Sequence, residues 1–87
     1  MVADKKECSG SETFGGSFHT VDECATNCKG KASMFVFGTN DYGTIRCKDD
    51  GCSCYCETSA TDEGACNRIN HNGYRLYRYG DYHILRI

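Results

Sequence analysis

The chain has 87 residues, with ten basic and twelve acidic side chains and a formal charge of −2, so it is expected to form one domain. This balance excludes a strongly cationic peptide and gives no general argument for nucleic-acid binding. No apolar run is long enough to span a bilayer, so membrane insertion is not expected either.

The cysteines indicate how so short a chain is stabilised. Only thirteen residues are Val, Ile, Leu or Phe, about 15% of the chain. Chains with less than roughly 20% of these residues usually lack enough apolar surface to form a packed core. Four disulfides at roughly 2–4 kcal/mol each would supply on the order of 10 kcal/mol, about the whole stability of a typical domain. We therefore expect a secreted protein that unfolds when reduced, with all eight cysteines in disulfides: Cys8, Cys24, Cys28, Cys47, Cys52, Cys54, Cys56 and Cys66.

The N-terminal segments carry few periodic signals. Residues 1–7 are polar and are expected to be a flexible segment ahead of a single domain over residues 8–87. Residues 8–19 contain three glycines, Gly10, Gly15 and Gly16, together with Phe14 and Phe18, which indicates an extended, turn-rich segment with two aromatic anchors.

Residues 20–30 carry the clearest helix signal. Thr20 and Glu23 have the spacing of a capping box, and Gly30 is a natural C-terminal stop. Cys24 and Cys28 fall on one apolar face with Val21 and Ala25. The pattern predicts a helix of two to three turns with both cysteines on its buried side.

Short strands are predicted after the helix, over residues 34–37, 44–47 and 52–57, with turns at 39–43 and 48–51. In residues 52–57 cysteine alternates with other residues at period two, so Cys52, Cys54 and Cys56 share one strand face. We expect the two helix cysteines to bond to cysteines among positions 47, 52, 54 and 56. The full connectivity stays open, because eight cysteines allow 105 pairings.

The last third is predicted to be an exposed loop over residues 58–64, a turn at 70–73, and two strands over 74–79 and 82–87. Cys66 is expected to fix the end of the loop. Together these elements predict a small disulfide-rich α+β fold, with one short helix packed on an antiparallel sheet.

The spacing of these elements resembles the PAN/apple module, the family of the N-terminal domain of hepatocyte growth factor and of leech antiplatelet proteins. The resemblance rests on the helix with its Cys24-x-x-x-Cys28 motif, the Phe35-Val36-Phe37 strand, Cys47 and the late run at 73–77. The chain departs from the family pattern in lacking a cysteine just before the aromatic strand and a cysteine after the last strand, and in adding the Cys-x-Cys-x-Cys run. The resemblance implies non-catalytic extracellular recognition of protein or carbohydrate and no cofactor.

Catalytic and metal chemistry are the alternatives to recognition. Paired zinc knuckles are absent, and an even number of cysteines leaves no thiolate to act as a nucleophile. No catalytic triad spacing, paired-carboxylate motif or phosphate loop is present. Acidic and amide residues in the loops could bind Ca²⁺, but the EF-hand spacing is missing and they are interpreted as solvated turns. No enzyme activity, metal or cofactor is therefore expected.

The C-terminal tyrosines and arginines form the most suggestive surface. Alternation places Arg75, Tyr77 and Tyr79 on one strand face, opposite Tyr74, Leu76 and Arg78. One face must pack on the helix, and the other is predicted to expose rings and guanidinium groups. The alternative is that the tyrosines complete a core that is short of aliphatic residues. The candidate ligand-binding residues are Arg75, Tyr77, Tyr79, Arg78 and Tyr42.

The sequence therefore predicts a secreted recognition module for an extracellular protein or glycan, of undetermined oligomeric state. A lectin or a sulfated-glycan binder would use the same surface. Binding that falls steeply with added salt would indicate a sulfated polymer, and competition by a neutral sugar at constant salt would indicate a lectin. A secreted inhibitor or toxin-like effector, with residues 58–64 as its reactive loop, is a third possibility.

Overall fold

The computed structural model describes residues 1–60 and 63–80, so the predicted strand over 82–87 and part of the loop over 58–64 lie outside the described residues. One α-helix, one 3₁₀ turn and six strands are present in this part of the chain. Their bounds are β1 (Ala3–Cys8), β2 (Thr13–Phe18), α1 (Val21–Cys28), β3 (Met34–Gly38), β4 (Cys47–Lys48), β5 (Gly51–Cys56), η1 (Glu63–Ala65) and β6 (Arg68–Arg78).

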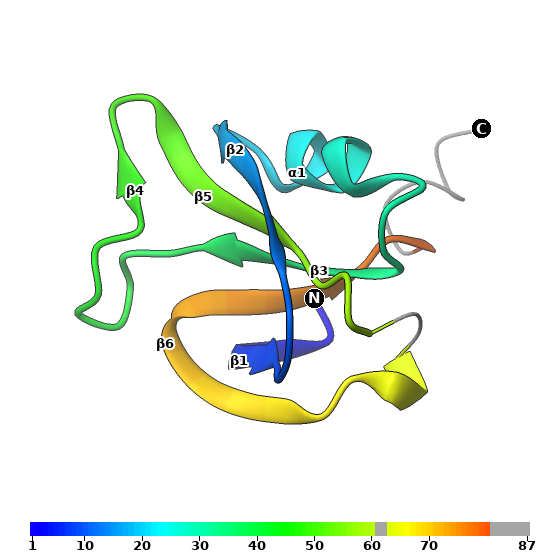
Figure 1. Cartoon of the computed structure of the whole chain (residues 1–87). Coiled ribbons are helices and arrows are strands. Elements are labelled where there is room, and N and C mark those ends of the chain that lie inside the picture. The colour runs from blue at the N-terminus through cyan, green and yellow to red at the C-terminus, as the bar shows by residue number, and fades with distance from the viewer. Residues whose placement is uncertain (61–62, 81–87) are drawn as a thin grey trace.

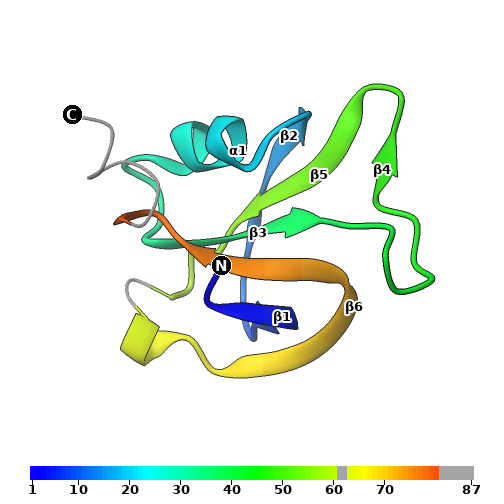
Figure 2. The ribbon, with the colours of Figure 1, turned by 180° about the vertical axis from the view of Figure 1, so that it is seen from behind.

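The strands form one antiparallel sheet in the order β1-β6-β3-β5-β2, with β4 paired to β5 outside this path. The helix packs on one face of the sheet, above β3 and β5 in Figure 1. Strand β6 bends through a broad arc with β1 beside it, and Figure 2 shows the same arrangement from behind. The predicted small disulfide-rich α+β fold is confirmed.

Helix α1 begins directly after Thr20, as the capping box predicts. The Thr20 hydroxyl accepts the backbone N–H of Glu23 at 3.2 Å, and the Glu23 carboxylate accepts the backbone N–H of Thr20 at 3.1 Å. Cys24, Ala25 and Cys28 are buried against the sheet. With eight residues, α1 falls far short of a membrane span, and no other described helix is long and apolar enough to cross a bilayer.

Four disulfides pair all eight cysteines. Two of them, Cys24–Cys54 and Cys28–Cys56, join the helix to β5, which confirms the expected partners of the helix cysteines. Cys47–Cys52 links β4 to β5. Cys8–Cys66 ties the end of β1 to the segment before β6. The framework therefore fixes the helix, the edge strand β1, the β4–β5 hairpin and the connection before β6.

The sheet buries apolar side chains on both faces. The helix side holds Cys24, Ala25, Cys28, Phe35, Phe37, Cys54, Cys56 and Tyr77. The opposite side holds Cys8, Met34, Val36, Ala60, Tyr74 and Leu76. Strand β3 is buried along its whole length because the helix covers one face and the curved end of β6, with β1, covers the other.

Three local expectations are corrected by the fold. Residues 3–7, expected to be flexible, belong to β1 and pair with β6. The predicted turn at 70–73 is an internal part of β6, which continues through it because β1 pairs alongside with a register shift between Asp4 and Lys6. The predicted strand over 44–47 is reduced to Cys47–Lys48.

A side chain explains the lost strand. Asn40 Oδ1 accepts the backbone N–H groups of Arg46 at 2.7 Å and Cys47 at 2.8 Å, and Asn40 Nδ2 donates to the Cys47 carbonyl at 3.0 Å. These bonds satisfy the backbone of the segment without a neighbouring strand. The following turn depends on Gly51, whose φ is +113° and whose missing Cβ would lie 2.5 Å from the Phe18 backbone.

Candidate functional site

The predicted ligand-binding residues do not form one exposed face. Tyr77 is only 7% exposed, and its ring stacks on Phe35 with centroids 5.4 Å apart, so the expectation that it is exposed is wrong. Tyr79 is half-buried against the same helix-side cluster, whereas Arg78 is exposed. The face of β6 that carries Arg75, Tyr77 and Tyr79 is the face that packs toward the helix, so the tyrosines largely complete the core.

Arg75 and Tyr42 do meet, in a cluster that three distant segments build. We call Asp4, Lys5, Asp41, Tyr42 and Arg75 the Tyr42 cluster. The Arg75 guanidinium lies 3.1 Å from the Asp4 carboxylate through Nε and 2.6 Å from the Asp41 carboxylate through Nη2. The Tyr42 hydroxyl donates to Asp4 and accepts from Arg75 Nη2 at 3.3 Å.

Cations also approach the Tyr42 ring. Lys5 Nζ lies 4.6 Å from the ring centroid and Arg75 Cζ lies 5.5 Å from it, both within cation–π range. The hydrogen bond from Tyr42, followed by those from Arg75, lowers the pKa of Asp4 below its usual value. Tyr42 and Asp41 in turn raise the pKa of Arg75. The cluster therefore holds a charged guanidinium and a phenol ring in fixed positions.

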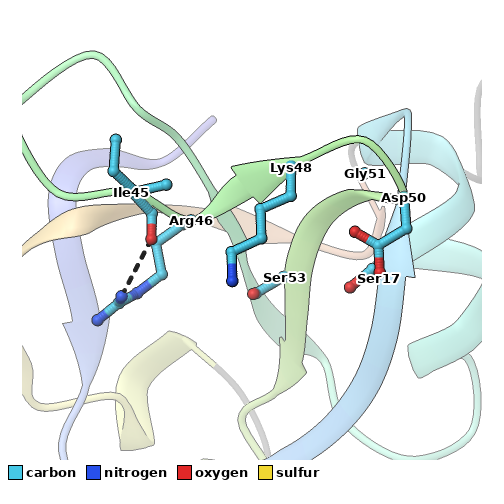
Figure 3. Close-up of a pocket in the computed structure, with 7 residues that line it drawn as sticks. All are labelled: Ser17, Ile45, Arg46, Lys48, Asp50, Gly51 and Ser53. Atoms are coloured by element: carbon cyan, nitrogen blue, oxygen red, sulfur yellow. Dashed lines mark hydrogen bonds between the residues drawn. The ribbon is translucent and has the colours of Figure 1, made fainter.

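A polar hollow of about 260 Å³ lies on the same face of β5 as Ser53. Figure 3 shows the Lys48 ammonium group pointing toward Ser53, with Asp50 and Ser17 on the other side of the hollow. Ser17 and Ser53 are register partners on β2 and β5, which fixes the spacing of their hydroxyls. The hollow offers both donors and acceptors, and its volume lies slightly below the roughly 300–1,000 Å³ of typical ligand pockets.

Arg46 borders this hollow and is held by close packing. A Cβ on Gly38 would lie 2.7 Å from Arg46 Cβ, and one on Gly73 would lie 2.8 Å from Arg46 Cγ. The guanidinium carbon lies 5.5 Å from the centroid of the Tyr74 ring. Glycines on two neighbouring strands thus make room for one arginine on the sheet face opposite the helix.

A group of carboxyls on this face was not predicted from the sequence. Glu7, Glu12 and Glu57, here called the carboxyl cluster, each place one carboxylate oxygen within 4.8 Å of the others. Burial, and next the neighbouring Glu12 carboxylate, raise the pKa of Glu57 to about 9. Burial and Glu12 also raise the pKa of Glu7. No sequence motif could have revealed this cluster, because fifty positions separate its first and last members.

The fold is that of a small disulfide-rich α+β domain, and it carries the Tyr42 cluster, the polar hollow and the carboxyl cluster. No protein-family model, curated protein or solved structure gives a significant match to the chain.

Proposed function

We propose that this chain is an extracellular recognition module of the PAN/apple type, which binds a protein partner through the Tyr42 cluster. The four disulfides support an oxidising extracellular setting. The helix joined to a sheet strand through Cys24 and Cys28, followed by the Phe35-Val36-Phe37 strand, supports the PAN/apple assignment.

The observation that carries the proposal is the fixed position of Arg75 beside Tyr42. Arginine and tyrosine are enriched among the residues that dominate binding energy at protein interfaces. Three segments hold the pair before any partner arrives, so little side-chain freedom is lost on binding. Asp4 and Asp41 balance the charges of Lys5 and Arg75, and their carboxylates would repel a sulfated polymer. Mixed charges of this kind favour a protein surface as the partner.

A binding screen with matched variants tests this proposal. The folded protein is screened against a panel of secreted and cell-surface ectodomains, and each hit is measured by surface plasmon resonance. We expect Arg75→Ala and Tyr42→Ala to weaken binding of a hit at least tenfold. Lys31→Ala, which removes an exposed cation beyond the helix, should leave affinity within twofold. Tyr42→Phe keeps the aromatic ring and removes the hydroxyl, so it separates the contribution of the ring to binding from that of the hydroxyl.

Two outcomes would overturn the proposal. One is that no ectodomain in the panel binds the wild-type protein. The other is that Arg75→Ala and Lys31→Ala have the same effect on the hits, since the partner would then not use the Tyr42 cluster. Melting temperatures of all variants show whether a loss of binding reflects a loss of folding.

Glycan binding is the second candidate function, and the polar hollow is the observation that favours it. Ser17, Ser53, Lys48 and Asp50 together can donate to and accept from sugar hydroxyls. A glycan array at two salt concentrations tests this candidate. Binding that falls steeply with salt indicates a sulfated chain, and competition by a neutral sugar at constant salt indicates a lectin. Lys48→Ala should weaken either mode, and Lys31→Ala should not; equal loss in both variants would exclude the hollow.

The inhibitor hypothesis stays a prediction. Its reactive loop, over residues 58–64, includes two residues outside the described ranges. Neither the two side-chain clusters nor the polar hollow favours protease inhibition.

A further inference from the structure

The carboxyl cluster gathers negative charge from three separate parts of the chain. Glu7 lies on β1, Glu12 directly precedes β2, and Glu57 directly follows β5. Their nearest carboxylate oxygens all lie within 4.8 Å of one another. The backbone N–H of Cys8, next to Glu7, donates to the Glu57 carboxylate, so β1 is held beside the end of β5 at this point.

Glu57 is fully buried, and only half of its carboxylate has a hydrogen-bond partner. Its Oε2 accepts the backbone N–H of Cys8, while its Oε1 is buried with no donor among the described residues. The Oε2 atom of Glu12 is also buried and unpartnered in this part of the chain. A buried carboxylate without a partner is costly, so the cluster requires a positive charge or a proton.

Among the described residues, no neighbouring side chain donates a hydrogen bond to these two oxygens. Arg46 lies near Glu7, and its buried Nε has no hydrogen-bond partner among the described residues. Its guanidinium is placed over Tyr74, and its Nη1 donates to the Ile45 carbonyl. Lys6, next to Glu7 on β1, donates to Asn70. His71 accepts the backbone N–H of Gly73 through Nδ1, and its ring lies 4.6 Å from that of Tyr74, which is itself buried.

We propose that Glu7, Glu12 and Glu57 form a binding site for Ca²⁺ or a hard divalent cation of similar size. Carboxylate oxygens are the ligands such ions prefer. Calcium–oxygen distances of about 2.3–2.6 Å allow two ligands to lie roughly 4.6–5.2 Å apart across the ion. The spacing of up to 4.8 Å in this cluster therefore fits calcium with little movement. Magnesium, at about 2.0–2.1 Å, would require the carboxylates to close in.

This site would act as a clamp between three segments. The ion would neutralise the unpartnered oxygens of Glu57 and Glu12 and join β1 to the ends of β2 and β5. Because Glu57 holds the Cys8 backbone N–H, the environment of that amide should change when the ion binds.

Calorimetry and NMR on the intact disulfide-bonded protein test the proposal. The protein is treated with EDTA, desalted and titrated with CaCl₂ at pH 8 in 0.1 M NaCl. We expect a dissociation constant on the order of 0.1–1 mM, typical of extracellular calcium modules, and a shift of the Cys8 amide resonance. Titration with MgCl₂ should give at least tenfold weaker binding.

Matched variants distinguish calcium binding at the carboxyl cluster from nonspecific binding to surface carboxylates. Glu57→Gln and Glu12→Gln should each weaken calcium binding at least tenfold. Asp49→Asn removes one carboxylate from an exposed turn and should change the affinity less than twofold. If Glu57→Gln fails to fold, the half-buried Glu12 still provides the comparison.

Three results would overturn the proposal. The first is the absence of both heat and a Cys8 amide shift up to 10 mM CaCl₂. The second is equal calcium affinity in Glu12→Gln and Asp49→Asn. The third is binding of Zn²⁺ at this cluster without binding of Ca²⁺, since that would contradict the assignment of a hard cation of calcium's size.

Discussion

Removing a disulfide should destabilise this protein more when that disulfide closes a longer stretch of chain, because the loop entropy grows with the logarithm of loop length. Cys8 and Cys66 are 58 residues apart, whereas Cys47 and Cys52 are 5 apart. The loop-entropy relation assigns about 4 kcal/mol to the longer crosslink and about 2 kcal/mol to the shorter one. Replacing both cysteines of a pair by serine should therefore lower the free energy of unfolding about twice as much for Cys8–Cys66.

Urea and thermal unfolding followed by circular dichroism measure this difference. A gap of about 2 kcal/mol corresponds to roughly 8–16 °C in melting temperature for a domain of this size. Full reduction of the native protein should unfold it, because its aliphatic core is small. Equal losses of stability in the two double variants would refute the dependence on loop length, and a fully reduced chain that remains folded would refute the dependence on disulfides.

Two further predictions follow from local contacts. Thr20→Ala removes the capping hydroxyl of α1 and should cost about 1 kcal/mol of unfolding free energy in urea titrations; an unchanged value would mean that the bond to the Glu23 amide contributes nothing. The pKa of Asp4, read by NMR titration, should lie below 3.8 because Tyr42 and then Arg75 stabilise its charged form. The stability this provides is present above the unfolded pKa and is lost as the pH falls through the lowered folded value. Tyr42→Phe should move the Asp4 pKa back toward 3.8, and an unmoved pKa would contradict the role of the hydroxyl.

The candidate sites show that sequence patterns identify suitable residue types but do not predict which of them lie together or are exposed. The chemistry of Arg75 and Tyr42 is enough to predict them as binding residues. Their ion-pair partners Asp4 and Asp41 come from distant segments, so the sequence does not predict these contacts. Tyr77 has the same side chain as Tyr42, yet it stacks on Phe35 in the core. Alternation along a strand assigns residues to two faces, but it does not say that both faces of a strand are covered.

The sequence by itself determined what short-range signals can encode. The capping of α1 by Thr20, the shared face of Cys54 and Cys56, and the need for disulfides each depend on residues a few positions apart or on composition alone. Only the tertiary structure decided how β1 and the curved β6 close over the second face of the sheet. That closure buries Glu57 and brings it to Glu7 and Glu12, because contacts between distant segments depend on the path of the whole chain.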